Sequence, residues 1–172
     1  MDIRHLIMAT CMFFGLTVAY AEVGEGKSTM QNGKVEEDFK QSERYQRGAK
    51  KLEELMAGHT NSETQELLGK INKVSPDVSR YAREFIMGDI LSRPGLDTKT
   101  REMLNVAVLT AIQAPVELKL HINFALNVGV TREEISEIIT QQVVYVGFPK
   151  AINGLHIAAD VFEERDKRGI SP

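Results

Sequence analysis

Apolar residues recur at spacings of three and four along most of the chain, from about Val35 to Arg168. This is the period of an amphipathic α-helix, and the strict alternation of a half-buried strand is sustained nowhere. The pattern predicts an all-α fold, a single-domain bundle of about six to seven helices over residues 35–168. No internal repeat and no further domain boundary interrupts that stretch.

Capping residues and helix breakers divide the pattern into separate helices. The first is expected from Asp38 to Met56, ended by Gly58. The second is expected from the capping box Thr60-x-x-Glu63 through Ile71, and the third from Ser75-Pro76 to just before Arg93. Two more are expected from Asp97 to about Gln113 and from Pro115 to Gly129. The last two are expected from the capping box Thr131-x-x-Glu134 to about Val146 and, after the break Gly147-Phe148-Pro149, to about Arg168.

Two segments are apolar almost all round, Met103–Ile112 and Val143–Phe148. A helix of that composition is expected to be buried on every side. One small bundle has little need for two such segments, whereas a subunit interface can bury the extra face. The sequence therefore predicts a homo-oligomer.

The N-terminus has the features of an export signal. A short start carrying Arg4 precedes the apolar run Leu6–Ala21, which ends in the small-x-small sequence Ala19-Tyr20-Ala21. Residues 1–21 are interpreted as a signal peptide and residues 22–34 as a flexible N-terminus. The protein is then exported to the bacterial periplasm or secreted, with no stable membrane insertion after cleavage. The alternative is an uncleaved N-terminal anchor.

Composition and charge exclude several classes of protein. The only cysteine is Cys11, inside the expected signal peptide, so a disulfide framework and a four-cysteine zinc site are excluded and the exported protein has no thiol chemistry. The net charge is −3. A chain without a basic excess is a poor partner for a phosphate backbone, so no nucleic-acid partner is expected.

A few polar residues interrupt the apolar pattern. Glu117 and His121 are four residues apart, so they share a helix face that Leu120 and Phe124 flank, and we expect this face to point inward. Because histidine titrates near neutral pH, His121 is a candidate acid or base. A surface ion pair or a core histidine with satisfied hydrogen bonds is the simpler explanation of the spacing. Glu102 is a further candidate, although an acid in the first turn of a helix is favoured there in any case.

Three other residues are candidates for binding a substrate. Tyr145 offers a hydroxyl, His156 lies among apolar residues of the last helix, and Arg101 is able to pair with a carboxylate. A core tyrosine and an exposed helix arginine are the simpler alternatives. A metal held by Glu117, His121 and a third ligand is conceivable, but no H-E-x-x-H or comparable pattern supports it, so no metal is expected.

Several segments in a fixed order resemble the carboxymuconolactone decarboxylase family. They span about Arg44 to Arg165 and are Arg44–Gly48, Phe85–Asp89, Ser92–Asp97, Thr100–Glu102, Glu117–His121, Ala125–Thr131 and Tyr145–Pro149. The resemblance implies an alkylhydroperoxidase D-like all-α fold. It also implies a homo-oligomer, a hexamer or a trimer, with no metal and no organic cofactor.

The same superfamily contains alkylhydroperoxidase D, whose site uses a C-x-x-C pair. Aligned on Glu102 and His121, the two cysteine positions fall here on Ala114 and Glu117. A thiolate is the nucleophile in peroxide reduction. This chain would therefore be called peroxiredoxin-like only because of its superfamily, since both thiols of the C-x-x-C pair are missing.

The resemblance implies cofactor-independent decarboxylation of a small carboxylated lactone, 4-carboxymuconolactone or a relative, or of a keto acid. His121 would donate a proton or a hydrogen bond to the developing dienolate. Glu117 would orient the imidazole, Glu102 would complete a proton relay or orient the substrate, and Arg101 would pair with a substrate carboxylate. The alternative from another class is an exported helical oligomer that binds a small carboxylated ligand without turnover.

Overall fold

The computed structural model describes residues 40, 42–56 and 62–170. They belong to the second of the two units into which the chain divides, Gly33–Pro172, and the description below concerns that unit alone. The expected signal peptide with Cys11, the expected flexible segment 22–34 and the expected capping residue Thr60 lie outside the described residues.

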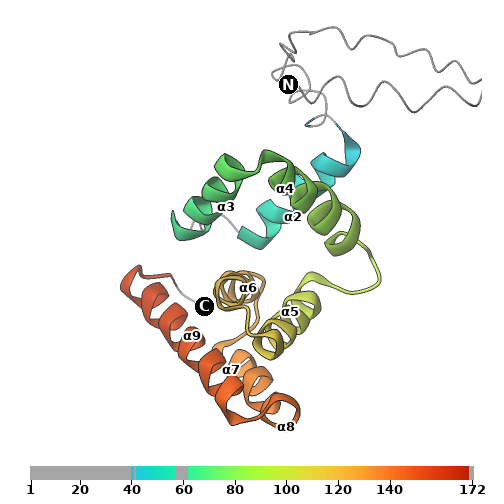
Figure 1. The fold of residues 1–172 in the computed structure, drawn as a ribbon. Coiled ribbons are helices and arrows are strands. Elements are labelled where there is room, and N and C mark those ends of the chain that lie inside the picture. Colours follow the sequence, from blue (N-terminus) through green and yellow to red (C-terminus); the bar gives the residue numbers. More distant parts are fainter. Residues whose placement is uncertain (1–39, 41, 57–61, 171–172) are drawn as a thin grey trace, which may run out of the picture. The chain divides into compact units, whose positions relative to one another are not determined.

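All regular structure in the described residues is helical, which confirms the expected all-α fold (Figure 1). None of the described helices is both long and apolar enough to cross a bilayer. The elements are α2 (Glu43–Met56), α3 (Ser62–Val74), α4 (Pro76–Tyr81), the π-helix η2 (Ala82–Leu91), α5 (Thr98–Ile112), α6 (Pro115–Asn127), α7 (Arg132–Gln141), α8 (Val143–Val146) and α9 (Phe148–Lys167).

Three expected helix starts are confirmed by side-chain caps, which satisfy backbone N–H groups that have no partner inside the helix. The Ser75 hydroxyl accepts from the backbone N–H of Val78 at 3.4 Å, and Asp97 accepts from that of Thr100 at 2.8 Å. Thr131 and Glu134 form the expected reciprocal capping box, with bonds of 3.0 and 2.8 Å.

Two expected helices are divided in the structure. The helix that begins at Ser75-Pro76 changes winding after Tyr81 and continues as the π-helix η2, and the helix that begins at Thr131 breaks at Gln142 into α7 and α8. Apolar spacings of three and four are compatible with both windings, so the pattern alone did not separate them.

The closest helix crossing joins α2 to η2 and depends on two glycines. A Cβ atom on Gly48 would lie 1.9 Å from the carbonyl oxygen of Arg83, and one on Gly88 would lie 2.3 Å from that of Arg44. Both distances are far inside van der Waals contact, so only glycine lets the two backbones approach this closely. The crossing brings together Arg44–Gly48 and Phe85–Asp89, two of the segments that carry the family resemblance.

Hydrogen-bonded ion pairs stabilise the same crossing of α2 and η2. Arg44 Nε donates to Asp89 at 2.9 Å, and Arg47 Nη2 donates to the other carboxylate oxygen at 3.3 Å. The hydrogen bond from Arg44 is the main reason that the pKa of Asp89 lies below its ordinary value. The two arginines of α2 thus fix the rotation of α2 against η2.

Helix α6 lies between α5 and α9 and carries most of the core (Figure 1). Its buried residues Leu118, Ile122, Ala125 and Leu126 pack into a cluster that α5, α7 and α9 complete. Its Phe124 instead packs with Leu52, Leu55 and Leu91 from α2 and η2. Helix α6 thus contributes to both apolar clusters.

The expectation that Met103–Ile112 is buried on every side is wrong for a single subunit. Leu104, Val108 and Ile112 are 52%, 56% and 64% exposed, and their spacing of four places them in one stripe along α5. Val144, Tyr145 and Phe148 of the second apolar segment are also exposed. The surplus apolar surface therefore lies on the outside of the subunit.

Candidate active site

The second turn of α5 and the middle of α6 bring an acid and an imidazole together; the expectation that Glu102 lies in the first turn of its helix is wrong, because α5 begins at Thr98. Glu102 is completely buried, with 0% of its surface exposed, and its Oε2 lies 2.7 Å from Nδ1 of His121. The His121 side chain is 17% exposed. Removing a carboxylate from water is costly unless hydrogen-bond donors replace the water, and His121 is one such partner of Glu102.

A distance of 2.7 Å between a ring nitrogen and a carboxylate oxygen requires a proton between them, because two lone pairs would repel each other. With that proton on Nδ1, His121 bonds to Glu102 through one of its two ring nitrogens. Nε2 makes no hydrogen bond to any of the described residues.

Asn105, one turn after Glu102, is a site residue that the sequence analysis missed. Its Nδ2 donates to Glu102 Oε1 at 3.2 Å and lies 3.3 Å from His121 Nδ1. The signal was available, because Asn105 is a polar residue inside the apolar segment Met103–Ile112. On the other side, the Phe124 ring stands edge-on to the imidazole, with 5.6 Å between centroids and an angle of 88°.

Glu117 occupies a different environment from the one expected. It lies in the first turn of α6, is exposed, and makes no hydrogen bond or ion pair with any described residue. The structure thus joins His121 to Glu102 of the neighbouring helix and leaves Glu117 toward solvent. Over the part of the chain that is described, no group of three or more histidine, cysteine or acidic residues is placed to hold a metal ion.

Arg101 is bound to the chain segment that leads into α5. Its Nε donates to the carbonyl of Leu96 at 3.2 Å and its Nη2 to that of Arg93 at 2.9 Å. Nη1 makes no bond to a described residue. Arg101 therefore ties the segment Ser92–Asp97 to the helix turn that carries Glu102, and one terminal nitrogen is left for another acceptor.

Tyr145 and His156 lie on α8 and α9, and no interaction within the described residues joins either to the Glu102–His121 pair. Tyr145 is exposed. His156 is exposed at a cavity of about 270 Å³, whose other lining residues are Leu109, Gln113, Ala114, Pro115, Leu118, Asn153 and Ile157. The structure therefore brings together Glu102 and His121 among the candidates and leaves these two apart.

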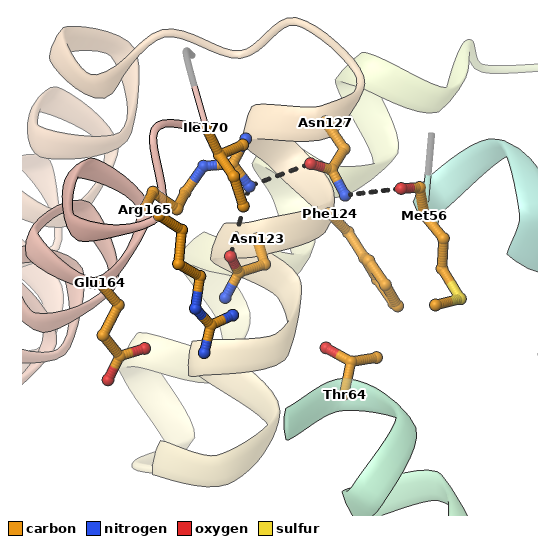
Figure 2. A pocket seen from close by; sticks show the side chains of 9 residues that line it. Met56, Thr64, Asn123, Phe124, Asn127, Glu164, Arg165 and Ile170 are labelled. Carbon is orange, nitrogen blue, oxygen red and sulfur yellow. Dashed lines mark hydrogen bonds between the residues drawn. The ribbon is translucent and has the colours of Figure 1, made fainter. Parts of the chain in front are cut away.

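A second polar cluster on the other side of α6 has a structural role (Figure 2). Arg165 of α9 donates to Asn127 at 3.0 Å and to Asn123 at 3.4 Å, and Asn127 in turn donates to the carbonyl of Leu55 at 2.9 Å. Burial is the main cause that lowers the pKa of Arg165. The cavity here measures about 10 Å³, the size of one water molecule, so the cluster joins α9, α6 and α2 without room for a substrate.

Comparison with known proteins places these helices in a family. The model of the carboxymuconolactone decarboxylase family matches residues 76–160, which include both helices of the Glu102–His121 pair. The 4-carboxymuconolactone decarboxylase of Acinetobacter baylyi is 33% identical over 131 residues, which cover 76% of this chain and 92% of that protein. This chain belongs to the carboxymuconolactone decarboxylase family.

Two further relatives match shorter parts of this family member. The nitrosuccinic acid decarboxylase of the fungus Metarhizium robertsii is 34% identical over 86 residues, half of this chain and 60% of that protein. An uncharacterized 15.0 kDa protein of Paracoccus denitrificans is 33% identical over 99 residues, 56% of this chain and 74% of that protein. The relatives whose names state an activity are both decarboxylases, which supports a decarboxylase-like function for this chain.

Proposed function

We propose that the protein is a cofactor-independent decarboxylase of a small carboxylated lactone, 4-carboxymuconolactone or a relative. The observation that carries the proposal is the bond of 2.7 Å between the fully buried Glu102 and His121. A carboxylate that is shielded from water and hydrogen-bonded to an imidazole orients that imidazole and stabilises its protonated form, as a general acid requires. The name of the Acinetobacter relative supplies the substrate class.

The reaction needs one acceptor for electrons and one source of a proton. When the carbon–carboxylate bond breaks, CO2 leaves and the bonding electrons move into the unsaturated lactone. The lactone becomes a dienolate, with its negative charge on the former carbonyl oxygen. An imidazolium at His121, with Nδ1 bonded to Glu102, would stabilise this charge through the N–H at Nε2 and transfer that proton to carbon. The neutral imidazole then takes a proton from water, and the cycle is closed.

We assign the orienting role to Glu102, since Glu117 is exposed and bonds no described residue. Arg101 is the residue proposed to meet a substrate carboxylate, through the terminal nitrogen that the carbonyls of Arg93 and Leu96 leave unoccupied. The segment that Arg101 fastens precedes Glu102 directly, so substrate binding and orientation of the pair would depend on the same helix turn.

The proposal includes a homo-oligomer, a hexamer or a trimer. The exposed side chains of Leu104, Val108 and Ile112 form an apolar stripe along α5, and exposed apolar surface of this kind is typical of an interface. A second copy of the chain is a partner able to bury the stripe. The stripe begins next to Asn105, so a copy seated there would lie beside the site and restrict its access to water.

We also propose that residues 1–21 are removed on export to the periplasm or the medium. The support is the apolar run that ends in Ala19-Tyr20-Ala21. Mass measurement of the protein from the periplasmic fraction tests this, and cleavage after Ala21 is the expected result. Recovery of the uncut chain in the membrane fraction would favour the anchor alternative.

A second candidate function is an exported oligomer that binds a small carboxylated ligand without turnover. The observation that favours it is the limited exposure of His121, 17%, which suits a core residue as well as an acid. Purified protein assayed for CO2 release from 4-carboxymuconolactone, related lactones and β-keto acids separates the two. The enzyme releases CO2 and loses this activity by roughly 10²- to 10⁴-fold in His121→Gln. Ligand binding without CO2 release supports the second candidate.

A further inference from the structure

We propose that Asn105 is a positioning residue that keeps Glu102 and His121 as an ion pair. Its amide bonds to the carboxylate of Glu102, and this bond holds the shared proton on the imidazole. The consequence for catalysis rests on the proposed function, whereas the protonation state of the pair is measurable without any substrate.

The geometry assigns the direction of the Asn105 bond. Nδ2 of Asn105 lies 3.2 Å from Glu102 Oε1 and 3.3 Å from His121 Nδ1. An amide nitrogen only donates, and Nδ1 has no free lone pair when its proton points to Glu102 Oε2 at 2.7 Å. The Asn105 donor is therefore used by Oε1, and each carboxylate oxygen of Glu102 has one donor.

The alternative to the ion pair is a neutral pair with the same number of protons. In the neutral pair, Glu102 carries the shared proton and donates it to Nδ1, and the imidazole retains only the proton on Nε2. An ionised carboxylate at 0% exposure is stable only with donors on its oxygens. Without Asn105, Glu102 would be ionised with a single donor, and the shared proton would move to the carboxyl.

The position of the shared proton, on His121 in the ion pair or on Glu102 in the neutral pair, decides whether His121 is able to act as a general acid. The N–H at Nε2 of an imidazolium is a good proton donor near neutral pH, whereas the N–H of a neutral imidazole is not. Protonation of the dienolate carbon in the proposed reaction requires the ion pair. Asn105 would thus act on the substrate through Glu102 and His121 without touching it.

The test compares wild type with Asn105→Leu, which keeps the number and branching of the side-chain heavy atoms and removes the donor. Nitrogen NMR of the imidazole, recorded at the pH of the activity assay, reports whether both ring nitrogens carry a proton. Wild type is expected to show both protonated, and Asn105→Leu is expected to show Nδ1 unprotonated, with a protonated Glu102 carboxyl in the infrared spectrum. Turnover should fall by roughly 10–100-fold, the size of loss known for removing the hydrogen-bond partner that orients a metal-bound histidine.

Two further variants keep the test decisive. Asn105→Ala removes the same donor with less bulk, for the case in which leucine prevents folding. Asn72→Leu makes the same chemical change on the exposed face of α3 and should leave the imidazole signals unchanged. Doubly protonated imidazole in a folded Asn105→Leu or Asn105→Ala protein overturns the inference. A wild type that releases no CO2 from any substrate overturns the proposed function instead, and the NMR result still decides the role of Asn105.

Discussion

His121 turns its Nδ1 atom to Glu102 on the preceding helix, at 2.7 Å, and not to Glu117 on its own helix. Glu117 is four residues from His121, a spacing that places both on one helix face, but its position in the first turn of α6 leaves it exposed. The acid 19 residues away is buried against the imidazole because α5 and α6 pack side by side. The contact between helices therefore decides which carboxylate bonds the imidazole.

Glu102→Gln and Glu117→Gln should differ sharply in activity. A glutamine at position 102 still accepts a hydrogen bond but has no negative charge to hold an imidazolium, so turnover should fall by roughly 10²- to 10⁴-fold. The exposed Glu117 bonds no described residue, so its replacement should change turnover by less than about twofold, which is within a surface effect of ±0.5 kcal/mol. Steady-state kinetics on both variants measures this.

The matched control is Glu137→Gln, which removes an exposed carboxylate on α7. Melting temperatures of the three variants show whether any loss of turnover follows from unfolding. A larger loss of turnover in Glu117→Gln than in Glu102→Gln would contradict the assignment of Glu102 and return the orienting role to Glu117.

Val108→Lys should separate the subunits of the proposed oligomer. Val108 is the middle of the exposed stripe on α5, and burying a lysine charge in an apolar interface is unfavourable. Light scattering should give a mass of several subunits for wild type and a smaller mass for the variant. Val74→Lys, at an exposed position on α3 outside the stripe, is the control and should leave the mass unchanged. A wild-type monomer at micromolar concentration would contradict the interface.

Gly48→Ala should destabilise the fold, because its Cβ atom would lie 1.9 Å from the carbonyl oxygen of Arg83. Forcing such a contact apart costs typically about 1–3 kcal/mol. Gly69→Ala makes the same change in α3, where nothing lies within 4 Å of the added atom, and should stabilise by roughly 0.5–1 kcal/mol. Denaturant unfolding of the two variants measures the opposite signs, and equal effects would show that the α2–η2 crossing is not close.

The helix starts were predictable because capping is local. Ser75, Asp97 and Thr131 each bond a backbone N–H three residues ahead, so the sequence alone contains both partners. The site was only half predictable for the opposite reason. Glu102 and His121 were recognised as polar residues on apolar helices, but their pairing depends on how α5 faces α6. Asn105 stands out in the sequence as a polar residue inside the apolar segment Met103–Ile112, but its partners Glu102 and His121 follow only from the helix contact.

Wild-type protein should not reduce hydroperoxides with a dithiol. The reaction needs a thiolate, and the only cysteine is Cys11 in the expected signal peptide. The structure places Ala114 at the N-cap of α6 and Glu117 in its first turn, so cysteines at both positions would lie at the helix N-terminus, three residues apart and close in space. Peroxide consumption by the wild-type protein freed of residues 1–21 would contradict the assignment to thiol-free chemistry.

The double variant Ala114→Cys with Glu117→Cys should acquire thiol reactivity. A helix N-terminus lowers the pKa of a cysteine thiol because its backbone dipoles favour the thiolate, and position 117 is exposed to reagents. We expect slow but measurable hydroperoxide reduction that depends on both thiols, followed by formation of a disulfide between them. Ala114→Cys alone is the control and should react once without a resolving partner. Because the Glu102–His121 bond uses neither position, the double variant should retain decarboxylation. Loss of decarboxylation in a double variant that has acquired thiol reactivity would show that Glu117 contributes to the site after all.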